Sequence, residues 1–179
     1  SFKLEKDVVQ AEIDILREMG VEFKTGVEVG KDITLNQLRE DGYEAFYIAI
    51  GCQGGRKINV PGEDADGVMT GVDFLHITTD DENYKLTGDT VVIGGGNVAI
   101  DVSRSAVRCD SANVYQVSLE TRDIMPALPE EIELAESEGI KFHGGWGPKE
   151  ILTENGLNEK DINLDIAQKT ADFLEEAGA

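Results

Sequence analysis

The sequence of 179 residues predicts an α/β protein with Rossmann-like, doubly wound parallel sheets. Two observations support this fold class. A glycine-rich turn at residues 94–96 separates a β-branched run from an amphipathic helix, and a second apolar run follows, all within about 30 residues. Before this, residues 7–50 alternate helix, strand, helix and strand, as in the back half of a doubly wound domain. We therefore expect one β-α-β unit preceded by a smaller α/β unit.

The first predicted element is an amphipathic helix over residues 7–19. Asp7 is placed to cap its N-terminus, and Gly20 can end it in the left-handed conformation. A short strand is expected over residues 21–24. The spacing of the apolar side chains predicts the buried stripe of the helix, which comprises Val8, Ala11, Ile15 and Met19, with Leu16 beside it.

A second helix and a second strand follow. Thr34 and Gln37 have the spacing of a capping box, so a helix should open there and close at Gly42. Residues 45–50 form an apolar run that ends at Gly51, which predicts a buried parallel strand.

The segment between the two units is mostly loop. The glycine- and proline-containing stretches 54–56 and 61–64 predict turns rather than a site. Residues 71–77 predict a short helix, and residues 78–88 a polar crossover. We expect the domain boundary near residue 80.

The central prediction is the turn between strand 90–93 and the helix that follows it. Gly94, Gly96 and Ala99 fill the three small positions of a G-x-G-x-x-G/A pattern. Gly94 allows the sharp turn, Gly96 lets a diphosphate approach the backbone, and Ala99 lets the helix pack close to the strand. A second strand over residues 114–117 completes the β-α-β unit.

The rest of the chain predicts further helices and strands. Pro129 suits the first position of a helix that Gly139 ends. Strands are expected over residues 140–143 and 149–153, and a terminal helix over residues 162–174.

A helix N-terminus that follows such a turn offers free N–H groups and a partial positive charge to phosphates. The expected donors are the N–H groups of Gly95, Gly96, Asn97 and Val98. The side chain of Asn97 could also cap the helix.

Two charged residues near the end of the second strand bear on the choice of dinucleotide. Glu120, which lies 24 positions after Gly96, is placed to bind the adenosine ribose. Its carboxylate would repel the 2′-phosphate of NADP(H), whereas Arg122 could reach that phosphate. These residues favour NAD(H) and leave NADP(H) possible.

Several motifs in one order resemble the glutamate synthase small (beta) subunit and its relatives among the FAD- and NAD(P)H-dependent pyridine nucleotide oxidoreductases. The resemblance runs from about residue 3 to residue 156 and is carried by residues 6–9, 12–14, 20–23, 29–34, 49–51, 61–64, 71–75, 94–102 and 125–131. It implies a domain that holds NAD(P)H while hydride passes to FAD and electrons continue to a partner subunit.

The sequence also departs from that family. The family's Tyr-Arg-Arg, which holds the 2′-phosphate of NADPH, corresponds here to Ser118, Leu119 and Glu120, so its NADPH preference is not carried over. The family's first FAD fingerprint and its iron–sulfur segment should precede residue 1, and more strands should follow residue 156. We therefore expect a fragment or a shortened form that does not bind FAD tightly alone. Its expected divisions are an FAD-type remnant (1–79), an NAD(P)-binding domain (80–157) and a C-terminal helix (158–179).

Composition limits the partners and the chemistry. A net charge of −20 argues against binding to nucleic acid or to anionic membranes, and no apolar run is long enough to span a bilayer. Cys52 and Cys109 have no C-x-x-C spacing, and His76 and His143 have no partner pattern, so neither a metal site nor a catalytic side chain is predicted. The thiols favour a cytoplasmic location.

The leading hypothesis is the NAD(P)H-binding portion of a flavin-dependent oxidoreductase, in which the cofactors supply the chemistry. The missing flavin and iron–sulfur segments, or a large-subunit electron acceptor, would be its partners. One alternative is a non-catalytic nucleotide-binding or protein-interaction module derived from the same family. Another is a Rossmann-like domain that binds a different adenosine ligand.

Overall fold

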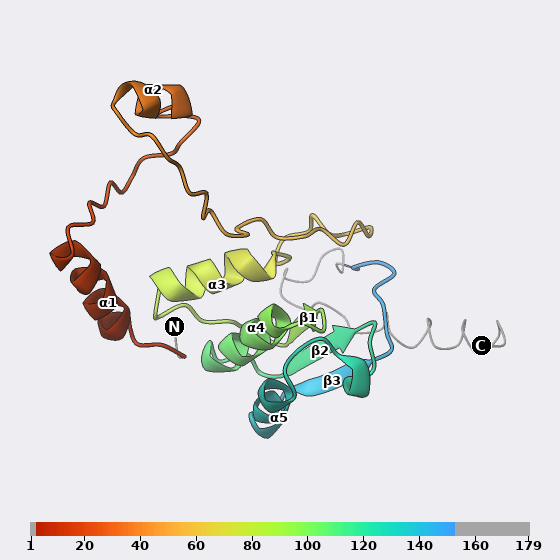
Figure 1. Cartoon of the computed structure of the whole chain (residues 1–179). Helices are drawn as coiled ribbons and strands as arrows, with labels where there is room; N and C mark the ends of the chain where they lie inside the picture. Colours follow the sequence, from red (N-terminus) through yellow and green to blue (C-terminus); the bar gives the residue numbers. More distant parts are fainter. Residues whose placement is uncertain (1–2, 153–179) are drawn as a thin grey trace. The chain divides into compact units, whose positions relative to one another are not determined.

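The computed structural model describes residues 3–152, which fall into two compact units divided between Gln53 and Gly54 (Figure 1). The first unit contains two helices, α1 (Lys6–Glu18) and α2 (Leu35–Glu40). The second contains α3 (Gly71–Asp80), β1 (Thr90–Ile93), α4 (Asn97–Arg108), β2 (Val114–Ser118), the 3-10 helix η1 (Arg122–Ile124), α5 (Pro129–Ser137) and β3 (Lys141–Gly144). A boundary between two functional domains near residue 80 stays a prediction.

Helix α1 forms where its apolar periodicity predicted it. The buried stripe predicted from that periodicity is wrong within the described residues, because Val8, Ile15 and Met19 are 48%, 53% and 74% exposed. Gly20 follows it with φ 93°, and its N–H donates to Arg17 O at 2.9 Å, so the left-handed end is confirmed. The predicted cap at Asp7 is wrong, because the N-cap position is Glu5, without a side-chain hydrogen bond. Asp7 lies in the first turn, where its charge still complements the helix dipole.

The capping box that opens α2 is confirmed. Thr34 Oγ1 accepts from Gln37 N at 3.2 Å, and Gln37 Oε1 accepts from Thr34 N at 2.9 Å. The two residues satisfy backbone donors reciprocally, so four positions of sequence were sufficient to locate this helix start. Gly42, with φ 97°, follows the last turn as expected.

Both strands predicted in the first unit are wrong. Residues 21–24 and 45–50 are extended chain without a ladder of hydrogen bonds to any described residue. The side chains of Tyr47, Ile48 and Ile50 are 94%, 73% and 79% exposed. A strand is stable only when it pairs with at least one neighbouring strand, and no strand pairs with these segments within residues 3–53.

The second unit carries the predicted parallel sheet, with the strand order β1-β2-β3 (Figure 1). Ile93 is paired with Val117, and Val117 is paired with His143. This register brings the carboxyl ends of all three strands to one edge of the sheet. The β-α-β unit and the Rossmann-like fold class are therefore confirmed.

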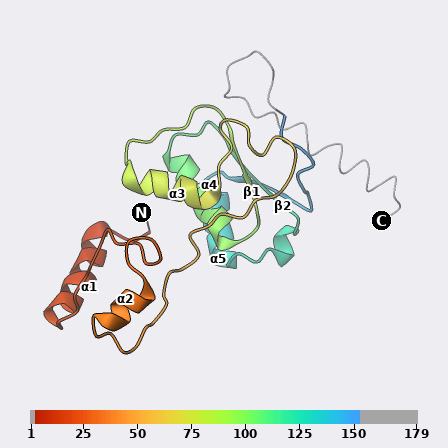
Figure 2. The ribbon, with the colours of Figure 1, turned by 90° about the horizontal axis from the view of Figure 1, so that it is seen from above.

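The helices cover this sheet in layers. Helix α4 packs on β1 and β2 and contacts α5, and α3 lies against α4 in both ribbon views (Figures 1 and 2). A Cβ built on Gly71 would lie 3.0 Å from Val102 Cγ2, so a residue without a side chain allows α3 to approach α4. Apolar side chains of these helices and strands form the core, with Ile100 and Ala106 among the most buried.

A buried arginine joins α4 to α5. Arg104, whose side chain is 9% exposed, pairs with Glu131 at 2.9 Å and with Glu138 at 2.8 Å. Arg108 also pairs with Glu138, at 2.9 Å. The burial of Arg104, a charged residue on an amphipathic helix, is a finding of the structure.

The predictions beyond β2 have mixed outcomes. Pro129 begins α5, and Gly139 follows its end with φ 88°, as predicted. The strand predicted over residues 149–153 is wrong for its described part, because Ile151 N donates at 2.8 Å to Pro61 O, which lies in a loop. The predicted terminal helix over residues 162–174 and the division at residues 158–179 lie outside the described residues.

The ion pairs of Glu138 predict a loss of stability in acid. Hydrogen bonds from Arg108 and Arg104 lower the pKa of Glu138 from 4.5 to about 2. Because the folded pKa lies below the unfolded one, this stabilisation is complete above about pH 4.5 and is lost as the pH falls toward 2. We expect a loss of up to about 3 kcal/mol in the free energy of unfolding over that range. Urea unfolding followed by the fluorescence of Trp146 would measure it.

The control for this prediction is Glu138→Gln. The variant should be less stable at neutral pH, and its stability should decline less steeply than that of the parent below about pH 4.5. Parallel declines in the two proteins would show that Glu138 does not contribute to the acid sensitivity.

Candidate functional site

The candidate site lies at the edge where the parallel strands end. The segments that follow β1 and β2 are the glycine turn at residues 94–96 and the residues 119–122. Gly145 N donates to Glu120 O at 3.2 Å, and Trp146 N donates to Ser118 O at 2.9 Å, so the segment after β3 lies at the same edge. The carboxyl edge of a doubly wound sheet is where ligands bind in such folds.

The glycine turn has the geometry that each small position requires. Gly94 has φ 143°, a conformation that side chains disfavour, and a Cβ built there would lie 3.3 Å from Ala99 Cβ. Gly96 has φ −90° and is the N-cap residue of α4. A Cβ built on Gly96 has no described heavy atom within 4 Å, so this position borders open space.

The backbone donors of the turn are not used by the described protein. Ile100 N donates to Gly96 O at 3.2 Å, which begins the hydrogen-bond ladder of α4. Among residues 3–152, no protein group accepts a hydrogen bond from the N–H of Gly95, Gly96, Asn97 or Val98. These donors, together with the positive end of the helix dipole, suit an anionic group such as a diphosphate.

A buried polar pair, Gln116 and Ser103, is hydrogen-bonded to the backbone of the glycine turn. The sequence analysis did not predict this pair. Gln116 Nε2 donates to Gly94 O at 3.0 Å, and Ser103 Oγ donates to Gln116 Oε1 at 2.9 Å. Both side chains are almost completely buried. The available signal was a glutamine in the middle of an otherwise apolar strand, since a buried amide requires partners.

The segment between η1 and α5 is also hydrogen-bonded to the glycine turn and to the start of α4. Ala127 N donates to Gly95 O at 3.1 Å, and Asn97 Oδ1 accepts from Leu128 N at 2.9 Å. The side chain of Asn97 therefore does not cap α4, and that alternative is wrong. It links the first residue of α4 to the connection before α5.

The carboxylate of Glu120 lies against the glycine turn. A Cβ built on Gly95 would be 2.9 Å from Glu120 Oε2. Ser118 Oγ donates to Glu120 O at 2.8 Å, which fixes the backbone where β2 ends. The tertiary structure thus brings Glu120 beside the turn, although 24 positions separate it from Gly96.

Arg122, the other charged candidate, is already engaged. Its Nε donates to Glu136 Oε1 at 2.6 Å and its Nη2 to Glu136 Oε2 at 2.7 Å. The carboxylate of Glu136, more than any other group, raises the pKa of Arg122. The structure therefore places the carboxylate of Glu120 against the glycine turn and pairs the guanidinium of Arg122 with α5.

The histidines and cysteines form no cluster of three or more possible metal ligands among the described residues. His76 is exposed on α3 and contacts Asp80 at 3.4 Å, whereas His143 lies on β3 beside the ring of Tyr115. The two described cysteines are free thiols, and burial raises the pKa of Cys109.

Comparison with known proteins identifies the kind of domain. A family model described as pyridine nucleotide-disulphide oxidoreductase matches residues 19–172. The chain is 36% identical over 159 residues to the NADP(+)-dependent formate dehydrogenase subunit beta of Moorella thermoacetica, a match that covers 87% of this chain and 22% of that protein. It is 35% identical over 164 residues to the glutamate synthase [NADPH] small chain of Halomonas elongata, covering 86% of this chain and 34% of that protein.

A solved structure agrees on the fold. FprA from Mycobacterium tuberculosis matches with a TM-score of 0.58 and 21% identity, over 76% of this chain and 45% of that one. The chain thus spans about a fifth to a third of the length of these two curated relatives. None of the helices within residues 3–152 has both the length and the apolar character needed to cross a membrane.

Proposed function

Because the chain belongs to the pyridine nucleotide-disulphide oxidoreductase family, we propose that it is the NAD(P)H-binding portion of a flavin-dependent oxidoreductase. In this proposal residues 80–157 bind the dinucleotide, and residues 1–79 are the remnant of the FAD-binding type of domain. The observation that carries the proposal is the turn at residues 94–96, where N–H groups that donate to no residue within 3–152 border open space beside the carboxylate of Glu120.

The described residues fit a dinucleotide. Gly96 leaves room for a diphosphate, and the N–H groups of Gly95, Gly96, Asn97 and Val98 would donate to it. Glu120 would accept hydrogen bonds from the adenosine ribose. Ala99, which packs against Gly94, would keep α4 close to β1.

The chemistry would come from the cofactors, because a reduced nicotinamide, when bound, would supply a hydride for transfer to FAD. The role of this chain would be to bind the dinucleotide and to orient its nicotinamide. Gln116 and Ser103 would keep the turn in place, and the links from Ala127 and Leu128 would hold the start of α4. FAD, an iron–sulfur segment and a large-subunit electron acceptor would belong to the larger flavoenzyme of which this chain is proposed to be a portion. The proposed location of that enzyme is the cytoplasm.

We propose NAD(H) rather than NADP(H) as the dinucleotide. A carboxylate beside the turn would oppose the 2′-phosphate, and the guanidinium of Arg122 is held by Glu136. The names of both relatives specify NADP(+) or NADPH, so NADPH is the alternative against which the proposal is tested.

The test is a titration of the protein with NADH and with NADPH. The emission of Trp146, the single tryptophan, is the expected reporter of binding, because the backbone N–H of this residue donates to Ser118 O at the edge of the proposed site. We expect NADH to bind at least about tenfold more tightly than NADPH, since like charges in contact cost several kcal/mol.

Other results would favour other functions. Tighter binding of NADPH would overturn the assignment to NAD(H). ATP binding as well as NADH would favour a different adenosine ligand. If NADH, NADPH and ATP all failed to bind, the nucleotide site would be overturned and an interaction module would be favoured. The exposed apolar side chains of residues 45–50 would suit that role.

A further inference from the structure

The pair formed by Arg122 and Glu136 has a geometry that matters for nucleotide choice. The guanidinium donates two hydrogen bonds, 2.6 and 2.7 Å long, to the two oxygens of one carboxylate. This paired arrangement is also the one by which arginine binds phosphate groups. The Nε and Nη2 donors that a phosphate would use are thus occupied by a residue of α5.

Arg122 is the arginine nearest in sequence to Glu120, the residue proposed to bind the ribose. It begins η1, two residues after Glu120, whose carboxylate lies against Gly95. A Cβ built on Gly144 would lie 2.9 Å from Glu120 O and 3.2 Å from Arg122 N, so β3 packs tightly on this backbone. The backbone that leads to Arg122 is therefore fixed at the edge of the sheet.

We propose that Glu136 determines the specificity for NAD(H) over NADP(H) by pairing with Arg122. The guanidinium of Arg122 is then not available to bind the 2′-phosphate of NADP(H). This inference rests on the proposed dinucleotide site. The carboxylate of Glu136 is part of the same folded domain, whereas a 2′-phosphate would have to break the existing pair first. Glu120 and Glu136 thus act together. Glu120 repels the 2′-phosphate, and Glu136 occupies the guanidinium of Arg122 that could otherwise bind this phosphate.

Removal of Glu136 should release the arginine. In Glu136→Ala, we expect the affinity for NADPH relative to NADH to rise at least about tenfold, because the released guanidinium can form charge-assisted hydrogen bonds to the 2′-phosphate. The measured quantity is the ratio of the two dissociation constants from the Trp146 titration. A ratio is needed because the loss of one negative charge favours every anionic ligand.

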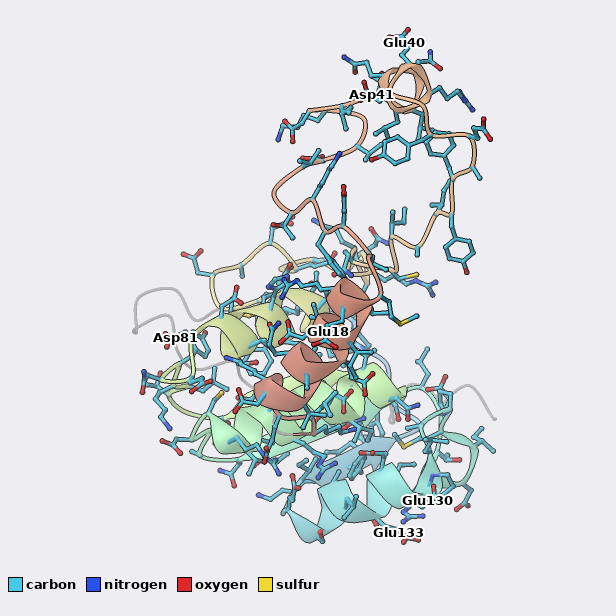
Figure 3. All side chains as sticks on the ribbon, turned by 60° about the vertical axis from the view of Figure 1, so that its left-hand side comes forward. Glu18, Glu40, Asp41, Asp81, Glu130 and Glu133 are labelled. Carbon is cyan, nitrogen blue, oxygen red and sulfur yellow. The ribbon has the colours of Figure 1, made fainter. Side chains whose placement is uncertain are left out.

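The chain provides a matched control on the same helix. Glu133 is exposed on α5 at the outer side of the second unit (Figure 3), and its smaller contribution to the raised pKa of Arg122 is Coulombic only. Glu133→Ala removes the same charge without releasing the guanidinium. Its ratio of dissociation constants should stay within about twofold of the parent.

A double variant tests whether Arg122 carries the effect. In Glu136→Ala combined with Arg122→Gln, the ratio should return to the parental value. An unchanged ratio in Glu136→Ala, or a raised ratio that persists in the double variant, would overturn the inference while NADH binding upheld the proposed function. A parent protein that bound neither nucleotide would overturn both.

Discussion

Replacement of Gly96 by alanine is expected to weaken NADH binding by at least about 30-fold, or about 2 kcal/mol. The backbone at Gly96 has φ −90°, which alanine adopts readily, and the added Cβ meets no described heavy atom within 4 Å. The methyl group would instead enter the space proposed for the diphosphate. The change should therefore affect the ligand and not the fold.

The matched control is Gly54→Ala. Gly54 also has no described neighbour within 4 Å of a built Cβ, but it lies outside the proposed site. Both variants should unfold at the urea concentration of the parent, and only the Gly96 variant should lose affinity in the Trp146 titration. Equal affinities in the two variants would show that the diphosphate does not approach this backbone.

Replacement of Arg104 by alanine is expected to destabilise the second unit by about 3 kcal/mol, because it breaks a buried ion-pair network. The Arg104 side chain is 9% exposed, and its guanidinium joins Glu131 and Glu138 of the α5 region to α4. Its loss would leave Glu138, whose side chain is 21% exposed, paired with Arg108 as the remaining arginine. Urea unfolding at neutral pH, followed by Trp146 fluorescence, measures the change.

The control for Arg104 is an exposed ion pair of the same unit. Lys85 Nζ lies 2.8 Å from Asp110 Oδ2, and the two side chains are 53% and 69% exposed. Lys85→Ala should change the free energy of unfolding by less than about 1 kcal/mol. A similarly small change for Arg104→Ala would contradict a stabilising role for the buried network.

Sequence reasoning was less successful in the first unit, and the reason is physical. The apolar run at residues 45–50 has the composition of a buried strand, but composition specifies only a preference. A strand also needs partners that donate and accept its backbone hydrogen bonds, and the described residues provide none to this run. The result is an extended segment in which Tyr47 is 94% exposed.

The sequence by itself determined the features that depend on neighbours a few positions apart. The capping box of Thr34 and Gln37, the left-handed Gly20, and the strand, glycine turn and helix around residues 90–108 all follow from local backbone geometry. These short-range rules sufficed to predict the β-α-β unit and the part of the backbone that would bind a diphosphate.

Only the tertiary structure decided how distant side chains meet. It joined Gln116 to the carbonyl of Gly94, buried Arg104 between two helices, and paired Arg122 with Glu136 across 14 positions. Each of these contacts depends on the register of the parallel sheet and on the packing of α4 and α5. Residue spacing shows which groups a chain carries, but the free energy of a charged or buried polar group depends on the partners that folding brings to it.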